Sequence, residues 1–125
     1  MREKRLTAVI ADDDAYLREM LRLLLRSDIY DVVGEASNGD TAVELCKRLQ
    51  PAVTLLDINM PGKDGLAVLD ELNTAKYRGK IVIMSAEATL DRVKLAVEKG
   101  AAGFIVKPFN SGKVLDELQL CLQKK

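Results

Sequence analysis

Three aspartates, Asp12, Asp13 and Asp14, follow an apolar run near the start of the chain. One aspartate is enough to cap the N-terminus of a following helix, a position where Asp is favoured. Three adjacent carboxylates repel one another, so the excess is more typical of a hard-cation site with oxygen ligands than of a stabilising feature. The triplet therefore indicates a candidate site for a divalent metal, with helix capping as the structural alternative.

Three more polar residues also end apolar runs: Asp57 in LLDINMPGKDG, Ser85 in IVIMSAE and Lys107 in GFIVKPF. Taken singly, they have ordinary explanations, because Asp opens turns, Ser forms ST-turns or caps helices, and a lone lysine is usually solvated. Taken with the aspartates, they supply a nucleophile, a metal clamp and donors for transferred oxygens. That set of groups fits phosphoryl transfer to a carboxylate.

The remaining sequence alternates strand-like apolar runs with segments in which Leu, Val and Met recur at helical spacing. We predict strands at 6–11, 30–36, 53–56, 81–85 and 102–106, and helices at 15–26, 40–49, 66–75, 90–99 and 112–123. This alternation requires crossover connections and hence an α/β fold, with a mostly parallel sheet covered by helices on both faces.

Ligands of such a sheet bind beyond the carboxyl ends of the strands, where the strand order reverses. If the first and third strands are neighbours, Asp57 meets Asp12 and Asp13 there, and a cation such as Mg²⁺ is needed to offset their repulsion. Lys107 is then the only cation that the sequence places at this edge. Without metal, the acidic cluster should carry a local electrostatic cost that is retained for function.

The composition is that of one soluble globular domain over residues 1–125: 48% of the residues are hydrophobic, 30% are charged and the net charge is zero. This balance gives no reason to expect contact with nucleic acid or an anionic membrane. The absence of histidine excludes imidazole bases and ligands. Cys46 and Cys121 lie within helical patterns and are expected to be buried, and with no signal or membrane-spanning segment the expected location is the cytoplasm.

The segments ADDD, LLDINMPGKDG, IVIMSAE and GFIVKPF resemble, in order and spacing, the landmark segments of response-regulator receiver domains of two-component signalling. Each segment is weak alone, but four in the correct order on the correct elements are specific, and the resemblance covers essentially the entire chain. It implies a flavodoxin-like, CheY-like fold: a doubly wound α/β domain with a five-stranded parallel sheet, strand order 2-1-3-4-5, and five flanking helices.

The resemblance also implies roles for the acidic residues. Asp57 would be the phosphoacceptor in a phosphorelay, and Mg²⁺ or Mn²⁺ would be bound by Asp12, Asp13, Asp57 and the backbone carbonyl of Asn59. Asn59 and Glu87 would tune the rate at which the acyl phosphate hydrolyses. Such a protein is not a conventional enzyme, because it catalyses only phosphoryl transfer to itself and its own dephosphorylation.

Further roles concern the switch and the partners. By resemblance, Lys107 and Ser85 contact the phosphoryl oxygens, and Ser85 and Phe104 form a switch, with an ordinary core phenylalanine as the structural alternative for Phe104. The expected partner face comprises the fourth helix, fifth strand and fifth helix, including Val93 and Lys94. A sensor histidine kinase or phosphotransfer protein would supply the phosphoryl group, and a downstream target would read it; the chain would be a monomer or a weak phosphorylation-dependent dimer.

Three other classes of protein share part of this residue pattern or its predicted topology. A receiver-shaped scaffold that acts without phosphorylation is the main alternative, although the intact acceptor, acid pair and lysine argue against it. A haloacid-dehalogenase-type phosphohydrolase would use the D-x-D pattern of the triplet, but the chain offers no further acidic pair after a late strand. A flavodoxin-type FMN carrier is rejected, because three aspartates would repel its phosphate.

Overall fold

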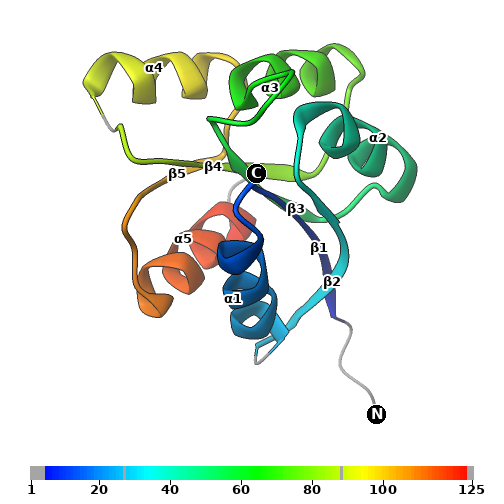
Figure 1. Cartoon of the computed structure of the whole chain (residues 1–125), viewed down its shortest axis with the longest axis vertical. Helices are drawn as coiled ribbons and strands as arrows, with labels where there is room; N and C mark the ends of the chain where they lie inside the picture. Colours follow the sequence, from blue (N-terminus) through cyan, green and yellow to red (C-terminus); the bar gives the residue numbers. More distant parts are fainter. Residues whose placement is uncertain (1–4, 27, 88, 124–125) are drawn as a thin grey trace.

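The computed structural model describes residues 5–26, 28–87 and 89–123, over which strands and helices alternate along the chain (Figure 1). Every predicted element is present, and each predicted boundary lies within one residue of the observed one. The strands are β1 (Leu6–Ala11), β2 (Tyr30–Ala36), β3 (Val53–Asp57), β4 (Lys80–Ser85) and β5 (Gly103–Val106). The helices are α1 (Ala15–Arg26), α2 (Gly39–Leu49), α3 (Gly65–Thr74), α4 (Leu90–Glu98) and α5 (Ser111–Gln123).

The sheet has the order β2-β1-β3-β4-β5 and all of its strand pairs are parallel, as the family resemblance implied. The chain passes from β2 back across β1 to β3, so the strand order reverses between β1 and β3. In doubly wound sheets this reversal opens the ligand-binding crevice. Ala11 pairs with Leu56, so the residues that follow these strands, from Asp12 and Asp57 onward, emerge side by side at the crevice.

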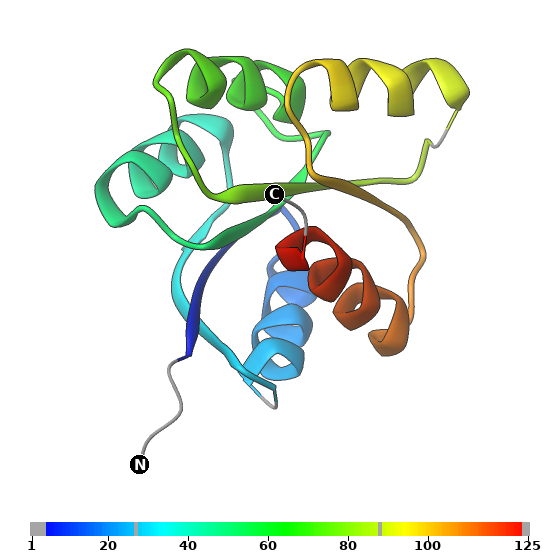
Figure 2. The same cartoon turned by 180° about the vertical axis from the view of Figure 1, so that it is seen from behind.

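Two helical layers cover the sheet: α2, α3 and α4 lie on one face, and α1 and α5 lie on the other (Figures 1 and 2). Successive side chains of the central strands pack alternately into the two layers. Leu56 packs with the α2, α3 and α4 side chains, whereas Leu55 packs with those of α1 and α5. All five residues of β3 are buried, which explains its uninterrupted apolar character.

Both cysteines are buried, as predicted from their places in helical patterns. Cys46 belongs to the layer of α2, α3 and α4, and Cys121 to the layer of α1 and α5. Over the part of the chain that the structure describes, no helix is long and apolar enough to cross a membrane.

Candidate functional site

The carboxylates of Asp12, Asp13 and Asp57 converge at the carboxyl ends of β1 and β3. One oxygen from each lies within 4.8 Å of the other two. Asp12 is only 1% exposed and Asp57 only 4%, whereas Asp13 is exposed to solvent. The predicted convergence of these side chains is therefore confirmed.

Helix capping belongs to the third aspartate of the triplet. The Asp14 carboxylate accepts the backbone N–H groups of Tyr16 (3.0 Å) and Leu17 (3.3 Å) in the first turn of α1. The Asp12 carboxylate accepts the N–H of Asp14 at 2.9 Å, which closes a tight turn after β1. One aspartate thus satisfies the helix end, as the capping alternative requires, and Asp12 and Asp13 remain at the crevice.

Lys107 joins the two buried carboxylates. Its Nζ lies 2.9 Å from Asp12 Oδ2 and 3.2 Å from Asp57 Oδ1, and its side chain is 23% exposed. The Lys107 backbone N–H donates to the Ser85 carbonyl at 2.8 Å, so the end of β5 is fixed beside the end of β4. The ordinary interpretation of Lys107 as a solvated lysine is therefore wrong.

The electrostatics of the site are unbalanced toward negative charge. Burial, followed by the charge of Asp12, raises the pKa of the Asp57 carboxyl, although Lys107 and a backbone hydrogen bond from Asn59 act in the opposite direction. Burial alone would lower the pKa of Lys107, but its contacts with Asp12 and Asp57 outweigh burial and raise it. The carboxylates exceed the ammonium in number, and an oxygen-only donor set of this kind fits a hard divalent cation.

Sequence reasoning missed a second cation at this edge. The Arg18 guanidinium donates to the backbone carbonyl of Asp12 at 2.6 Å and lies 3.5 Å from a carboxylate oxygen of Glu35 on β2. The expectation that Lys107 is the only cation there is therefore wrong. The spacing in the sequence could have predicted this contact, because a helix that starts at Ala15 brings Arg18 back over the end of β1 within one turn.

Ser85 and Phe104 lie on neighbouring strands but are not engaged with the acidic cluster. Ser85 is fully buried, and its hydroxyl donates to the Glu87 carbonyl (3.2 Å) and accepts the Glu87 N–H (3.0 Å). This is the ST-turn that the structural alternative predicted. Phe104 is half-buried and packs against the core under α2, α3 and α4. Its role as a switch stays a prediction.

The loop after β3 is held closely against the site. The Gly65 N–H donates to the Ile58 carbonyl at 2.8 Å, and a Cβ on Gly65 would lie 2.5 Å from the Asp57 carbonyl oxygen, so a side chain is excluded there. Asn59 is exposed within this loop. Lys63 fastens the loop to both neighbouring helices through ion pairs with Asp40 (3.3 Å) and Glu71.

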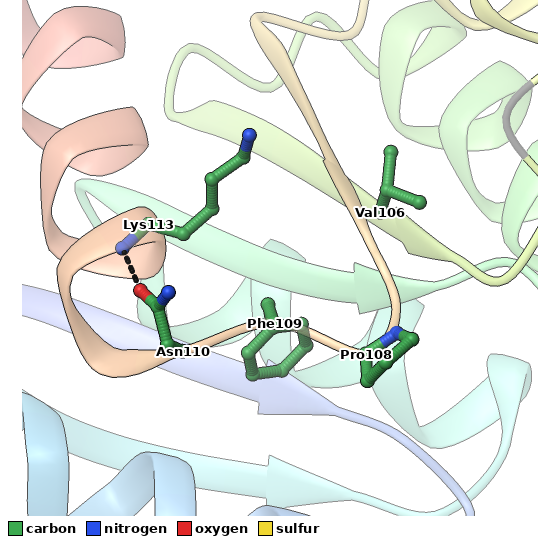
Figure 3. Close-up of a pocket in the computed structure, with 5 residues that line it drawn as sticks. All are labelled: Val106, Pro108, Phe109, Asn110 and Lys113. Carbon is green, nitrogen blue, oxygen red and sulfur yellow. Dashed lines mark hydrogen bonds between the residues drawn. The ribbon is translucent and has the colours of Figure 1, made fainter.

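The connection from β5 to α5 lines two hollows. A cavity of about 230 Å³ is lined by Val106, Pro108, Phe109, Asn110 and Lys113, and the Asn110 side chain accepts the Lys113 N–H at 2.9 Å (Figure 3). A second hollow, of about 410 Å³, shares Pro108 and Phe109 and extends past Lys107 to α1. Lys107, which contacts the buried carboxylates, therefore borders the second hollow.

An acidic cluster neutralised in part by a lysine, at the switch point of a 2-1-3-4-5 parallel sheet, defines a doubly wound α/β domain of the CheY-like class. The chain belongs to the response regulator receiver domain family, whose model matches residues 8–119. It is thus a receiver domain of two-component signalling, a class of signalling proteins rather than metabolic enzymes. This family membership overturns the haloacid-dehalogenase-type alternative.

Similar proteins include the chemotaxis protein CheY of Thermotoga maritima, which is 38% identical over 110 residues, 88% of this chain and 92% of that protein. The chemotaxis protein CheY of Bacillus subtilis is 37% identical over 114 residues, 91% of this chain and 95% of that protein. Among solved structures, the CheX-CheY-BeF3-Mg complex from Borrelia burgdorferi matches with a TM-score of 0.91 and 28% identity, over 95% of this chain and 90% of that one.

Proposed function

We propose that Asp57 accepts a phosphoryl group from a histidine kinase or phosphotransfer protein, with the help of a divalent cation. The observation that carries the proposal is the placement of Lys107 between the buried carboxylates of Asp12 and Asp57, with Asp13 beside them. No catalytic histidine is available in the chain, so the acceptor chemistry belongs to a carboxylate.

In the proposed reaction an oxygen of Asp57 attacks the phosphorus of a phosphohistidine, the P–N bond breaks, and the imidazole leaves with the electron pair of that bond. Lys107 then exchanges part of its contact with Asp57 for a charge-assisted contact with the new phosphoryl oxygens. The backbone hydrogen bond of Asn59 and the ammonium of Lys107 favour the ionised, nucleophilic form of Asp57. Burial opposes it, which is one reason why a cation is needed.

The metal ligands in this proposal are Asp12, Asp13, Asp57 and the carbonyl of Asn59. Mg²⁺ or Mn²⁺ bound there would neutralise charge that develops on the phosphoryl oxygens. The fit rests on three carboxylate oxygens that lie within 4.8 Å of one another. Because Asp14 caps α1, none of the three is needed to satisfy that helix end.

Intact-mass measurement after incubation with a small acyl phosphate and Mg²⁺ tests the assignment. Wild type should gain the mass of one phosphoryl group and Asp57→Asn should gain none. Asp64→Asn is the matched control, because Asp64 lies in the same loop and its side chain only caps α3, a role that Asn fills about equally well. Equal labelling of wild type and Asp57→Asn would refute the acceptor, and unlabelled wild type would favour the scaffold alternative.

The switch proposal follows from the contacts of Ser85. Its hydroxyl is occupied by the backbone of Glu87, so engaging a phosphoryl oxygen requires an exchange of partners and a movement of the β4–α4 connection. Phosphorylation would act by favouring the arrangement in which that exchange has occurred and Phe104 has turned inward. Unchanged resonances around Phe104 after addition of beryllofluoride and Mg²⁺ would contradict the switch.

The partner face is proposed on α4, β5 and α5. On α4, Lys94 is exposed and Val93 is half-buried. Several large apolar side chains of α4 and β5 are also exposed: Leu90, Leu95, Val97 and Val106. The carboxylate of Glu87, which is proposed to tune hydrolysis of the acyl phosphate, lies 3.5 Å from the guanidinium of Arg92 on α4. This ion pair links the β4–α4 connection to the proposed partner face. A downstream target or a second copy of the chain would bind here.

A further inference from the structure

Strand β5 is an edge strand, so one side of its backbone has no neighbouring strand. The outward N–H of an edge strand is ordinarily left to water or to another chain. At Phe104 it is not: the N–H donates to Oε2 of Glu117 on α5 at 3.3 Å. A helix carboxylate thus takes the place of the missing strand at this position.

The contact depends on a close approach that the sequence of β5 permits. A Cβ on Gly103 would lie 2.6 Å from Glu117 Oε2 and 2.5 Å from Cys121 Sγ, so any side chain at Gly103 would displace the carboxylate or the helix. Glu117 is half-buried, whereas the preceding Asp116 is exposed. The carboxylate of Glu117 is therefore directed to the strand, while its neighbour on the helix faces solvent.

Phe104 is consequently attached to both helical layers. Its ring packs against the core under α2, α3 and α4, and its backbone is bonded to α5 on the opposite face. The side chain of the adjacent Ile105 packs with those of α1 and α5. A rearrangement of Phe104 therefore acts on the Glu117 contact directly.

We propose that Glu117 is a positioning residue that couples α5 to the edge of β5 at Phe104, so that a change of state at Phe104 is transmitted to α5. This inference rests on the proposed switch. Without the contact, β5 and the ring of Phe104 can rearrange while α5 remains in place. The coupling requires an acceptor oxygen at the end of a side chain of this length, rather than a negative charge on α5 in general.

Backbone amide resonances of the full chain, recorded with and without beryllofluoride and Mg²⁺, test the coupling. In wild type we expect shifts near Asp57 and Lys107, at Phe104 and along α5. Glu117→Ala and Glu117→Asp should keep the shifts near Asp57 and Lys107 but lose those of α5, since one variant lacks the carboxylate and the other is too short to reach. Glu117→Gln retains an acceptor oxygen and should respond like wild type.

Asp116→Asn is the matched control, because it removes an exposed carboxylate from the same helix. It should leave the response of α5 unchanged. An intact α5 response in Glu117→Ala or Glu117→Asp would overturn the coupling, and Glu117 would then only satisfy the N–H group at the edge of β5. Loss of the α5 response in Glu117→Gln would also overturn the coupling. Absence of shifts near Asp57 in wild type would instead contradict the proposed function itself.

Discussion

Strand β3 carries two buried polar groups, and they differ in kind. Thr54, the second residue of the strand, lies in a neutral network. Its hydroxyl is 3.3 Å from Cys46 Sγ and 3.2 Å from the Tyr77 hydroxyl, which in turn donates to the Pro51 carbonyl at 2.7 Å. Asp57 lies at the carboxyl end of the same strand among charges. The first network crosses between elements of the core, and the second faces the crevice.

Burial acts on both groups but has different consequences. It raises the pKa values of the Tyr77 hydroxyl and the Cys46 thiol, so these groups stay neutral, and each has a hydrogen-bond partner. At Asp57 burial and Asp12 raise the pKa, yet one ammonium is shared between two buried carboxylates. A satisfied neutral network stabilises the fold, whereas an incompletely neutralised charged cluster retains a cost that a ligand can relieve.

The largest effect is expected at the lysine of the charged cluster. Lys107→Met should lower the free energy of unfolding by about 2 kcal/mol without metal, because two buried carboxylates lose their ammonium; the partial exposure of Lys107 keeps the loss below that of a fully buried pair. Mg²⁺ should shrink this loss by supplying charge. Denaturant unfolding with and without Mg²⁺ measures it, with the exposed Lys94→Met as control; an equal loss in both conditions would contradict the comparison.

A mutation in the neutral network should lower the free energy of unfolding by less, and by the same amount with and without Mg²⁺. Tyr77→Phe removes the hydroxyl that contacts Thr54 and Pro51, which should cost about 1 kcal/mol. The same denaturant experiment should give one value with and without Mg²⁺. Tyr16→Phe, at a side chain that is 72% exposed, should have no effect. Dependence of the Tyr77→Phe loss on Mg²⁺ would mean that the two groups on β3 are coupled.

Removal of one acidic charge should act in the opposite direction. Asp13→Asn relieves repulsion and should stabilise the metal-free protein, but because Asp13 is exposed the gain should stay below about 1 kcal/mol. The variant should also lose the increase in melting temperature that Mg²⁺ gives to wild type by mass action. Asp14→Asn, at the helix cap, should keep that increase. A destabilised Asp13→Asn that still responds to Mg²⁺ would show that the metal site is misplaced.

The smallest effect is a difference in pH dependence. The pKa of Asp57 is raised in the folded state, so the stability contributed by its protonated form is complete below the ordinary value of about 3.9 and is lost as pH rises through the raised value. Asp57→Asn does not titrate there. Without metal, its stability advantage over wild type should therefore be largest near neutrality and shrink on acidification. Denaturant unfolding of both proteins at a series of pH values checks this. A difference in free energy of unfolding that grows as pH falls would contradict the raised pKa of Asp57.

Much of this architecture could be predicted from local sequence. The alternation of apolar runs and helical periodicity predicted every element to within one residue at each end, because both periods are properties of the backbone. Since parallel strands end at a common edge, the residues after strand ends could also be predicted to meet. For that reason Asp12, Asp13 and Asp57 were expected to meet if the first and third strands were neighbours, and the strand order fulfils that condition.

Contacts that depend on how helices rotate and how far side chains reach were decided only by the tertiary structure. Tyr77 on Thr54 and Glu117 on Phe104 each join segments that no sequence period relates. Even the division of the aspartate triplet, with Asp14 at the helix and its neighbours at the crevice, depended on the turn after β1. Sequence determined which groups arrive at the sheet edge, and packing determined which partner each group binds, because side-chain partners are selected by three-dimensional distance and burial.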